Sequence, residues 1–297
     1  MATFIGNKQV GATFVIEKEI EKTKFGATID TIIGEVDSNG VLQKSKWSGA
    51  LNFAGVKEIG VLALNNAFYD QTGITSVDLS SVKTVQNNGL ASAFYSCDEL
   101  TSIDLSSLET ITGPYALANM CYVCNKLKSV DLRSLKTVDA VYGAQNAFHD
   151  CKALTDVNLS SLESVANNGL YGMLYNCPSL KSINLSSLKT VGDYGLNATF
   201  FNDTAFESID LSSLETLGTL AMTNTFYNCK VMTKISFPSL TNVQVDSFGT
   251  TSTNFAFRNC TGLTEIHLRA DMQATFEAMT GYVDKWGATN ATIYFDL

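Results

Sequence analysis

One phrase of 26 or 27 residues recurs along most of this chain. Residues 175–191 read YNCPSLKSINLSSLKTV, and five edited copies of this stretch occupy 95–111, 122–138, 149–165, 201–217 and 227–243. Aligned on their leucines, the copies keep this spacing except for one step of 31 residues, where 245–254 are inserted. A single unit of this size cannot bury its own apolar residues, so the units must stack around one continuous core.

Each unit has three parts with different apolar spacing. In the strand-like segment SIDLS, alternation places Ile103 and Leu105 on one face. The SLET segment that follows turns an apolar pair back into the core. The third part has apolar residues at i, i+4 and i+7, such as Leu90, Phe94 and Cys97. That spacing predicts a short helical segment with one apolar stripe.

The period and the leucine spacing predict an α/β leucine-rich-repeat solenoid over residues 48–268. It should have about eight coils of 26–27 residues, with a parallel sheet on one face and short helical segments on the other. The eight full units begin near residues 51, 77, 103, 130, 157, 183, 209 and 235.

The two ends of the chain lack the repeat. Residues 1–47 are interpreted as an N-terminal cap or an attachment segment. Residues 269–297 are interpreted as a C-terminal cap, with an amphipathic helix over 271–287 and a final strand over 291–297. Such caps would cover the open ends of the core.

The charge balance excludes several classes of partner. The chain has 29 acidic and 20 basic residues and a net charge of −9. This argues against binding to nucleic acid, which needs clustered Lys and Arg, and against attraction to anionic lipid. No apolar stretch reaches the length of a membrane span, and no signal peptide is visible at the start of the chain. We therefore expect neither nucleic-acid binding nor membrane insertion.

The stretch AFYSCDELTSIDLSSLETI at 93–111 resembles the Treponema-type, or BspA-like, bacterial leucine-rich repeat. The matching residues are Phe94, Cys97, Leu100, Ile103 and Leu105, with equivalents in the other units. The resemblance covers about residues 50–268. The units here are longer than is typical of that family, and LSSL replaces its usual proline-containing strand exit, except at Pro238.

The resemblance implies a binding protein of a bacterium or its phage that acts in adhesion. It implies an extracellular, cell-surface or virion location, and no enzymatic activity.

Six of the seven cysteines occupy one column of the repeat. They are Cys97, Cys124, Cys151, Cys177, Cys229 and Cys260, and Cys121 lies in the Phe94 column. Zinc would need two ligand pairs at short spacing, and only one such pair exists. Side chains in one column run parallel and do not point at each other, which disfavours disulfides. We expect free, buried thiols, and no metal or cofactor.

Charged residues form a column in which the sign alternates from Lys83 onward. Its members are Lys57, Lys83, Glu109, Lys136, Glu163, Lys189 and Glu215. Opposite charges on adjacent parallel strands attract each other. We therefore expect a row of exposed salt bridges with a structural role.

The outward face of the strands is the first candidate for ligand binding. It carries Asp78, Asp104, Asp131, Asn158, Asn184 and Asp210, flanked mainly by serines. Two interpretations stay open: a solvated face that prevents association, or a surface that binds a carbohydrate or a protein.

An aromatic column is the second candidate. It runs Tyr69, Tyr95, Tyr122, His149, Tyr175, Phe201 and Tyr227. These rings either pack between coils or, where exposed, contact a ligand. Tyr95, Tyr122 and Tyr175 are the candidate ligand contacts.

Catalysis has little support in the sequence. His149 and His267, the two histidines, fill repeat columns, and no nucleophile motif or phosphate-binding loop occurs. We therefore expect a non-enzymatic protein that adheres to a protein or carbohydrate on a cell or host surface. The alternative is a structural or receptor-binding component of a phage particle. The sequence leaves the oligomeric state open, with a monomer among the options.

Overall fold

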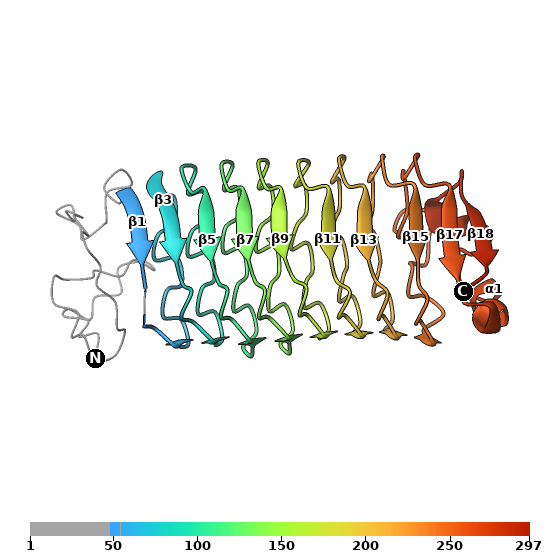
Figure 1. Ribbon diagram of the computed structural model, residues 1–297, viewed down its shortest axis with the longest axis horizontal. Helices are drawn as coiled ribbons and strands as arrows, with labels where there is room; N and C mark the ends of the chain where they lie inside the picture. The colour runs from blue at the N-terminus through green and yellow to red at the C-terminus, as the bar shows by residue number, and fades with distance from the viewer. Residues whose placement is uncertain (1–47, 54) are drawn as a thin grey trace.

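The computed structural model describes residues 48–53 and 55–297, and the interpretations of residues 1–47 lie outside this part of the chain. The described residues form an elongated solenoid of stacked coils (Figure 1). One face carries ten parallel strands, which fall into three hydrogen-bonded groups. The predicted leucine-rich-repeat architecture is confirmed.

The three groups follow one another along the solenoid. The first group is β1 (Ser48–Asn52), β3 (Gly73–Asp78), β5 (Ser102–Asp104), β7 (Ser129–Asp131) and β9 (Asp156–Asn158). The second is β11 (Ser182–Asn184) and β13 (Ser208–Asp210). The third is β15 (Lys234–Ser236), β17 (Glu265–Leu268) and β18 (Thr292–Phe295).

A second parallel sheet, which the sequence did not reveal, is built from the SLET segments. Its strands are β2 (Glu58–Ile59), β4 (Thr84–Val85), β6 (Thr110–Ile111), β8 (Thr137–Val138), β10 (Ser164–Val165), β12 (Thr190–Val191), β14 (Thr216–Leu217) and β16 (Asn242–Val243). They pair in one unbroken order from β2 to β16. In β6, for example, Ile111 is buried and Thr110 is half-buried. This continuous ladder holds the coils together along the whole repeat.

The third part of each unit, predicted as a short helix, is a run of consecutive tight turns. Ser92 and Ser96 have left-handed φ angles of 52° and 57°. The Phe94 amide donates to the Met120 carbonyl of the next coil at 2.8 Å, whereas the Tyr95 amide donates to Ser92 at 3.3 Å. An α-helix would bond every amide within its own segment. The helix prediction was therefore wrong, because every second amide joins neighbouring coils.

The spacing of the left-handed residues explains the helical pattern in the sequence. They recur every fourth position, so residues such as Leu90 and Phe94 face the core together, as they would on a helix. Most of these positions hold Asn, Asp, Ser or Gly, which tolerate a positive φ, as at Asn88 and Asn146. That four-residue recurrence of turn-forming residues was the available signal for turns.

The cysteine column is part of the core. All seven cysteines are buried and free. The Sγ of Cys177 lies 3.2 Å from the Phe148 carbonyl oxygen of the preceding coil, and Cys229 makes the same contact with Phe200. The thiols therefore fill space as small apolar groups and also satisfy buried carbonyls.

We expect the folded protein to shield its thiols from reagents. Burial raises the pKa of the Cys260 thiol to about 12 and raises the pKa of Cys177 as well. Because the thiolate is the reacting form, reaction with a disulfide reagent should be very slow in the native state. In denaturant without reductant, seven thiols should titrate rapidly. Fewer than six would contradict the free-thiol prediction.

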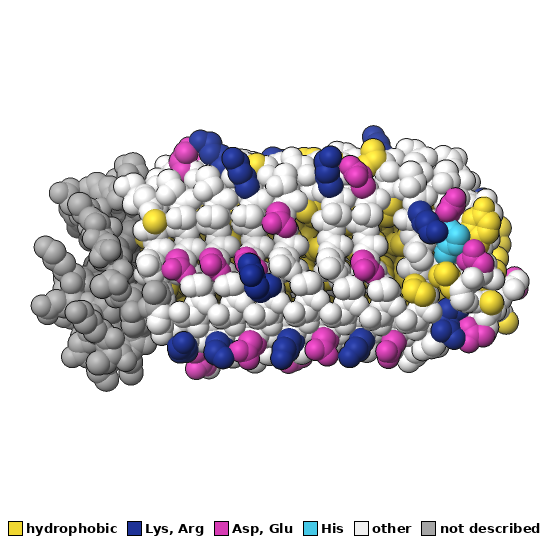
Figure 2. Space-filling model, in the orientation of Figure 1, with side chains coloured by type: hydrophobic (Ala, Val, Ile, Leu, Met, Phe, Trp, Pro, Cys, Tyr) yellow, Lys and Arg dark blue, Asp and Glu magenta, His cyan; other side chains and the backbone are white. Residues whose placement is uncertain are grey.

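The alternating charges lie in one row on the surface. Figure 2 shows Lys and Glu side chains alternating along the lower edge of the solenoid. The Nζ of Lys83 is 2.7 Å from Glu109, and Lys189 is 3.6 Å from Glu163. The hydrogen bond from Lys83 lowers the pKa of the Glu109 carboxyl. Both partners of each pair are exposed, so the row contributes little to stability.

The C-terminal end of the chain has largely irregular structure between β17 and β18. The segments after β17 are the 3-10 helix η1 (Ala270–Met272), the helix α1 (Gln273–Glu277) and the 3-10 helix η2 (Lys285–Gly287). The predicted helix over 271–287 is therefore wrong in length. Trp286 is fully buried, and its indole nitrogen donates to the Thr280 carbonyl at 2.9 Å. This ring packs against Phe248, at 4.9 Å between centroids.

Candidate functional site

The polar column on the strand face is tied into the backbone. Parallel register sets Asp78 beside Asp104 and Asp104 beside Asp131, and it sets Asn184 beside Asp210. In each strand, one side-chain oxygen accepts a hydrogen bond from the amide two residues later; for Asp104 and Ser106 the distance is 2.8 Å. The same bond forms at Asp78, Asp131, Asn158, Asn184 and Asp210. These residues therefore form the turns at the strand exits.

Only part of each side chain is used in this way. Asp104 is half-buried and Asp210 is exposed, and among the described residues the second carboxylate oxygen of each makes no hydrogen bond. Asp131 differs because Arg133 contacts it through two nitrogens, with Nε at 2.8 Å from Oδ2. That hydrogen bond lowers the pKa of the Asp131 carboxyl. The column thus combines a turn-forming role with free acceptor groups.

The aromatic column forms a continuous stack of rings. From Tyr69 to Tyr227, neighbouring rings lie 4.2–5.0 Å apart and nearly parallel. Tyr95, Tyr122 and Tyr175 each have a ring against both faces. Burial raises the pKa of all three phenols. Packing between coils therefore covers the ring faces, and only the edges of these tyrosines reach the surface.

The strand face opens between β13 and β15. Among the described residues no backbone ladder joins these two strands, or β9 to β11, and Figure 1 shows wider spacing at both places. Between β11 and β13, the Leu185 amide donates to Asp210 at 3.2 Å and the Glu207 amide donates to Lys181 at 2.6 Å. The equivalent amide of Leu211 finds no acceptor in the described residues.

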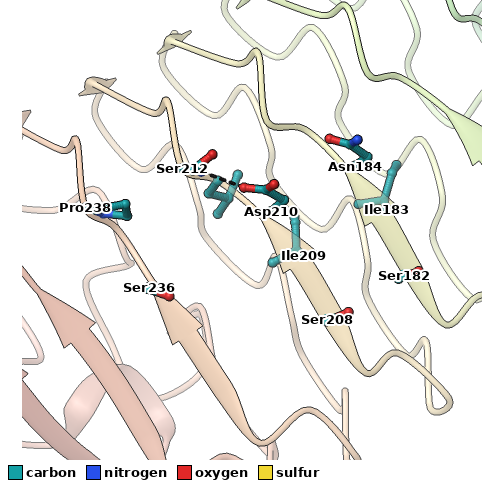
Figure 3. A pocket seen from close by; sticks show the side chains of 10 residues that line it. Ser182, Ile183, Asn184, Ser208, Ile209, Asp210, Ser212, Ser236 and Pro238 are labelled. Carbon is teal, nitrogen blue, oxygen red and sulfur yellow. Dashed lines mark hydrogen bonds between the residues drawn. The ribbon is translucent and has the colours of Figure 1, made fainter.

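A groove follows the strand face up to this opening (Figure 3). Its volume is about 470 Å³. Its rim is formed by Ser182, Asn184, Ser208, Asp210, Ser212 and Ser236, and its floor by Ile183, Ile209, Leu211 and Pro238. Ile209 is half-buried, whereas its equivalents Ile103 and Ile183 are buried. The opening of the sheet therefore exposes apolar surface.

Two substitutions in the repeat accompany the opening. Phe206, two residues before β13, stands where earlier coils have Leu154 and Leu180, and Phe237, directly after β15, replaces a leucine such as Leu211. Both phenylalanines are fully buried. A close-packed core responds to changes in side-chain volume, and these two larger residues lie in the coils on either side of the opening. These departures from the repeat were the sequence signal that our interpretation missed.

A smaller groove lies nearer the N-terminal end of the same face. Its volume is about 320 Å³, and it is lined by β3, β5 and β7, including Asp78, Asp104 and Asp131. The ladder is intact here, so Val77 and Ile103 below it are buried. Polar and apolar surface line this groove about equally, and it lacks the open floor found at β13.

Five of the nine candidate residues line one of the two grooves, and four line neither. Asn184 and Asp210 line the larger groove, and Asp78, Asp104 and Asp131 line the smaller one. Asn158 and the three tyrosines line neither. Ile209, Ser236 and Pro238 were not predicted. In the described part of the chain, no group of three His, Cys, Asp or Glu side chains is placed to hold a metal.

A family model decides the classification of the chain. The model described as BspA type leucine rich repeat region matches residues 63–197 and 119–254, with six copies of the repeat. The chain belongs to the BspA-type leucine-rich-repeat family. This confirms the resemblance that Phe94, Cys97 and their equivalents indicated. No curated protein matches the sequence. No helix in the described residues has the length and apolar character of a membrane span.

The chain is similar to several solved structures at low sequence identity. A leucine-rich cell surface protein from Faecalibacterium prausnitzii is 16% identical; the match covers 83% of this chain and 78% of that one, with a TM-score of 0.32. An internalin from Listeria monocytogenes is 13% identical, with 87% and 84% covered and a TM-score of 0.30. A chain in the Drosophila Toll–Spatzle complex is 16% identical over 74% of this chain, with a TM-score of 0.43. The match spans about a quarter of that last chain.

Proposed function

We propose that this protein is a non-enzymatic binding scaffold that attaches to a protein or carbohydrate at a cell surface through its strand face. The observation that carries this proposal is the build of that face. Small polar side chains stand over a continuous apolar layer, and grooves of about 320 and 470 Å³ hollow it. Both volumes fall in the range of ligand-binding clefts.

Membership in a leucine-rich-repeat family supports the proposal. Solenoids of this type present an extended surface on rigid elements, and they generally serve as binding scaffolds. The net charge of −9 favours neutral or basic ligands over acidic ones. An extracellular or cell-surface location is part of the same proposal.

The proposal predicts that charge on the strand face affects binding. The full-length protein is applied to immobilised glycans, to extracellular proteins and to intact cells, and we expect saturable binding in at least one of these assays. Changing Asp104, Asp131 and Asp210 together to Asn should weaken that binding several-fold. Asn keeps the oxygen that forms the strand-exit turn, as Asn158 and Asn184 show, so the fold should be retained.

A matched control removes three carboxylates elsewhere. It changes the net charge by the same amount as the triple Asp variant, but in the charged row at the edge of the solenoid. Its three substitutions are Glu109→Gln, Glu163→Gln and Glu215→Gln. This variant should bind like the original protein. Equal loss in both variants would indicate a general charge effect, and absence of any binding would contradict the proposed function.

A further inference from the structure

The opening between β13 and β15 leaves backbone groups without partners. By the register of the repeat, the Leu211 amide should face the Ser236 carbonyl. In the same way, the Thr233 amide should face the Glu207 carbonyl. The equivalent groups bond directly between β11 and β13, at 3.2 and 2.6 Å. At the opening, neither bond forms among the described residues. Polar backbone groups near a core are costly to leave unsatisfied, so they favour a ligand that supplies donors and acceptors together.

The width of the opening limits what can enter it. Some Cα atoms of β13 and β15 still lie within 8 Å of each other. Inserting another strand would need about 9.5 Å, which is twice the normal strand spacing. The opening is therefore too narrow for a peptide backbone that pairs with both strands. A hydroxyl group is small enough, and it can accept from an amide and donate to a carbonyl at once.

The rest of the groove fits the same kind of ligand. Its rim carries four serine hydroxyls, the Asn184 amide and the Asp210 carboxylate, and its lining includes Ile209 and Pro238, which lie on the two sides of the opening (Figure 3). Pro238 has no amide hydrogen, so the strand exit of β15 cannot form the turn found at Ser212 and presents an apolar wall. Hydroxyl-rich edges next to a small apolar surface complement a sugar ring, which has hydroxyls at its edge and C–H groups on its faces.

We propose that this groove is a saccharide-binding site that takes a neutral or basic sugar. Asp210 is the charged side chain that lines it, and the protein is acidic overall, so acidic sugars are disfavoured. Sugar hydroxyls occupy the opening between β13 and β15, and the C–H face of the ring rests on Ile209 and Pro238. This proposal rests on the proposed binding function and assigns its ligand class and its site.

The test uses the full-length protein on an array of neutral, amino and sialylated glycans, with immobilised extracellular proteins as a second arm. Ser208→Trp places an indole in the groove from an exposed position on β13. Thr292→Trp is the matched control, since Thr292 has the equivalent exposed position on β18, in the intact ladder with β17, and lines neither groove. Far-UV circular dichroism and gel filtration establish that both variants are folded.

We expect binding to neutral or amino glycans that falls at least about tenfold in Ser208→Trp and is unchanged in Thr292→Trp, because a ring in the groove excludes the ligand. Equal binding by Ser208→Trp and the original protein would overturn the site. Binding to proteins with no glycan binding would overturn the ligand class and leave the proposed function standing. Binding in neither arm would overturn both.

Discussion

Phe226→Ala should lower the free energy of unfolding by about 3–5 kcal/mol, the largest effect that we expect from one substitution. Phe226 is fully buried, and its ring centroid lies 5.6 Å from Phe200, 6.1 Å from Phe206 and 5.7 Å from Phe257. Removing it takes away the contact that links three coils. The surrounding coils are held by two sheets and cannot collapse freely into the cavity.

Urea denaturation followed by circular dichroism measures this loss. Val231→Ala is a suitable control, because Val231 is 47% exposed and should change the free energy of unfolding by no more than about 0.5 kcal/mol. A loss below about 1 kcal/mol in Phe226→Ala would show that the ring does not carry the packing between these coils.

Asp203→Asn should raise the stability of the protein at neutral pH. Asp203 occupies the cysteine column and is fully buried; its Oδ1 accepts the Cys177 amide at 2.6 Å. Its Oδ2 has no hydrogen-bond partner in the described residues. Burial raises the pKa of this carboxyl well above its usual value. An unsatisfied buried polar group costs roughly 1–3 kcal/mol, and a charge costs more.

The direction of the pH dependence follows from the raised pKa. The folded state holds the Asp203 proton more tightly than the unfolded state, where the pKa is near 3.8. This contribution to stability is fully present below that value, and it is lost as the pH rises through the raised pKa of the folded state. The advantage of Asp203→Asn should therefore grow from pH 4 toward neutral pH.

Urea denaturation across that pH range measures this advantage. Val231→Ala, at an exposed position, is the control and should show no such trend, because it removes no titrating group. A constant difference between Asp203→Asn and the original protein at every pH would contradict a buried, titrating Asp203.

The repeated phrase determined the architecture of this protein. A period of 26–27 residues with fixed apolar columns can bury its side chains only by stacking, so the solenoid and the buried cysteine column followed from the sequence. The alternating row of Lys and Glu followed too, because equivalent residues of adjacent coils are neighbours in space.

The local conformation of the turn segments was decided by contacts between coils. Spacing such as Leu90 to Phe94 fits both a helix and a run of turns, so periodicity could not separate them. The turns form because every second amide bonds to the next coil, as Phe94 does to Met120. The ring faces of Tyr95 and Tyr122 are covered for a similar reason. Equivalent residues of adjacent coils lie at a distance at which aromatic rings stack, and these two ring centroids are 5.0 Å apart.

The candidate site depended most on the tertiary structure. Asp210 and Asn184 stood in a column that the sequence shows plainly, but the groove beside them exists because β13 and β15 do not pair. The distance between two strands depends on how core side chains from several coils pack together, and a single unit of the repeat does not reveal it. The sequence by itself determined which residues face outward, and the packing of the core decided where that surface opens.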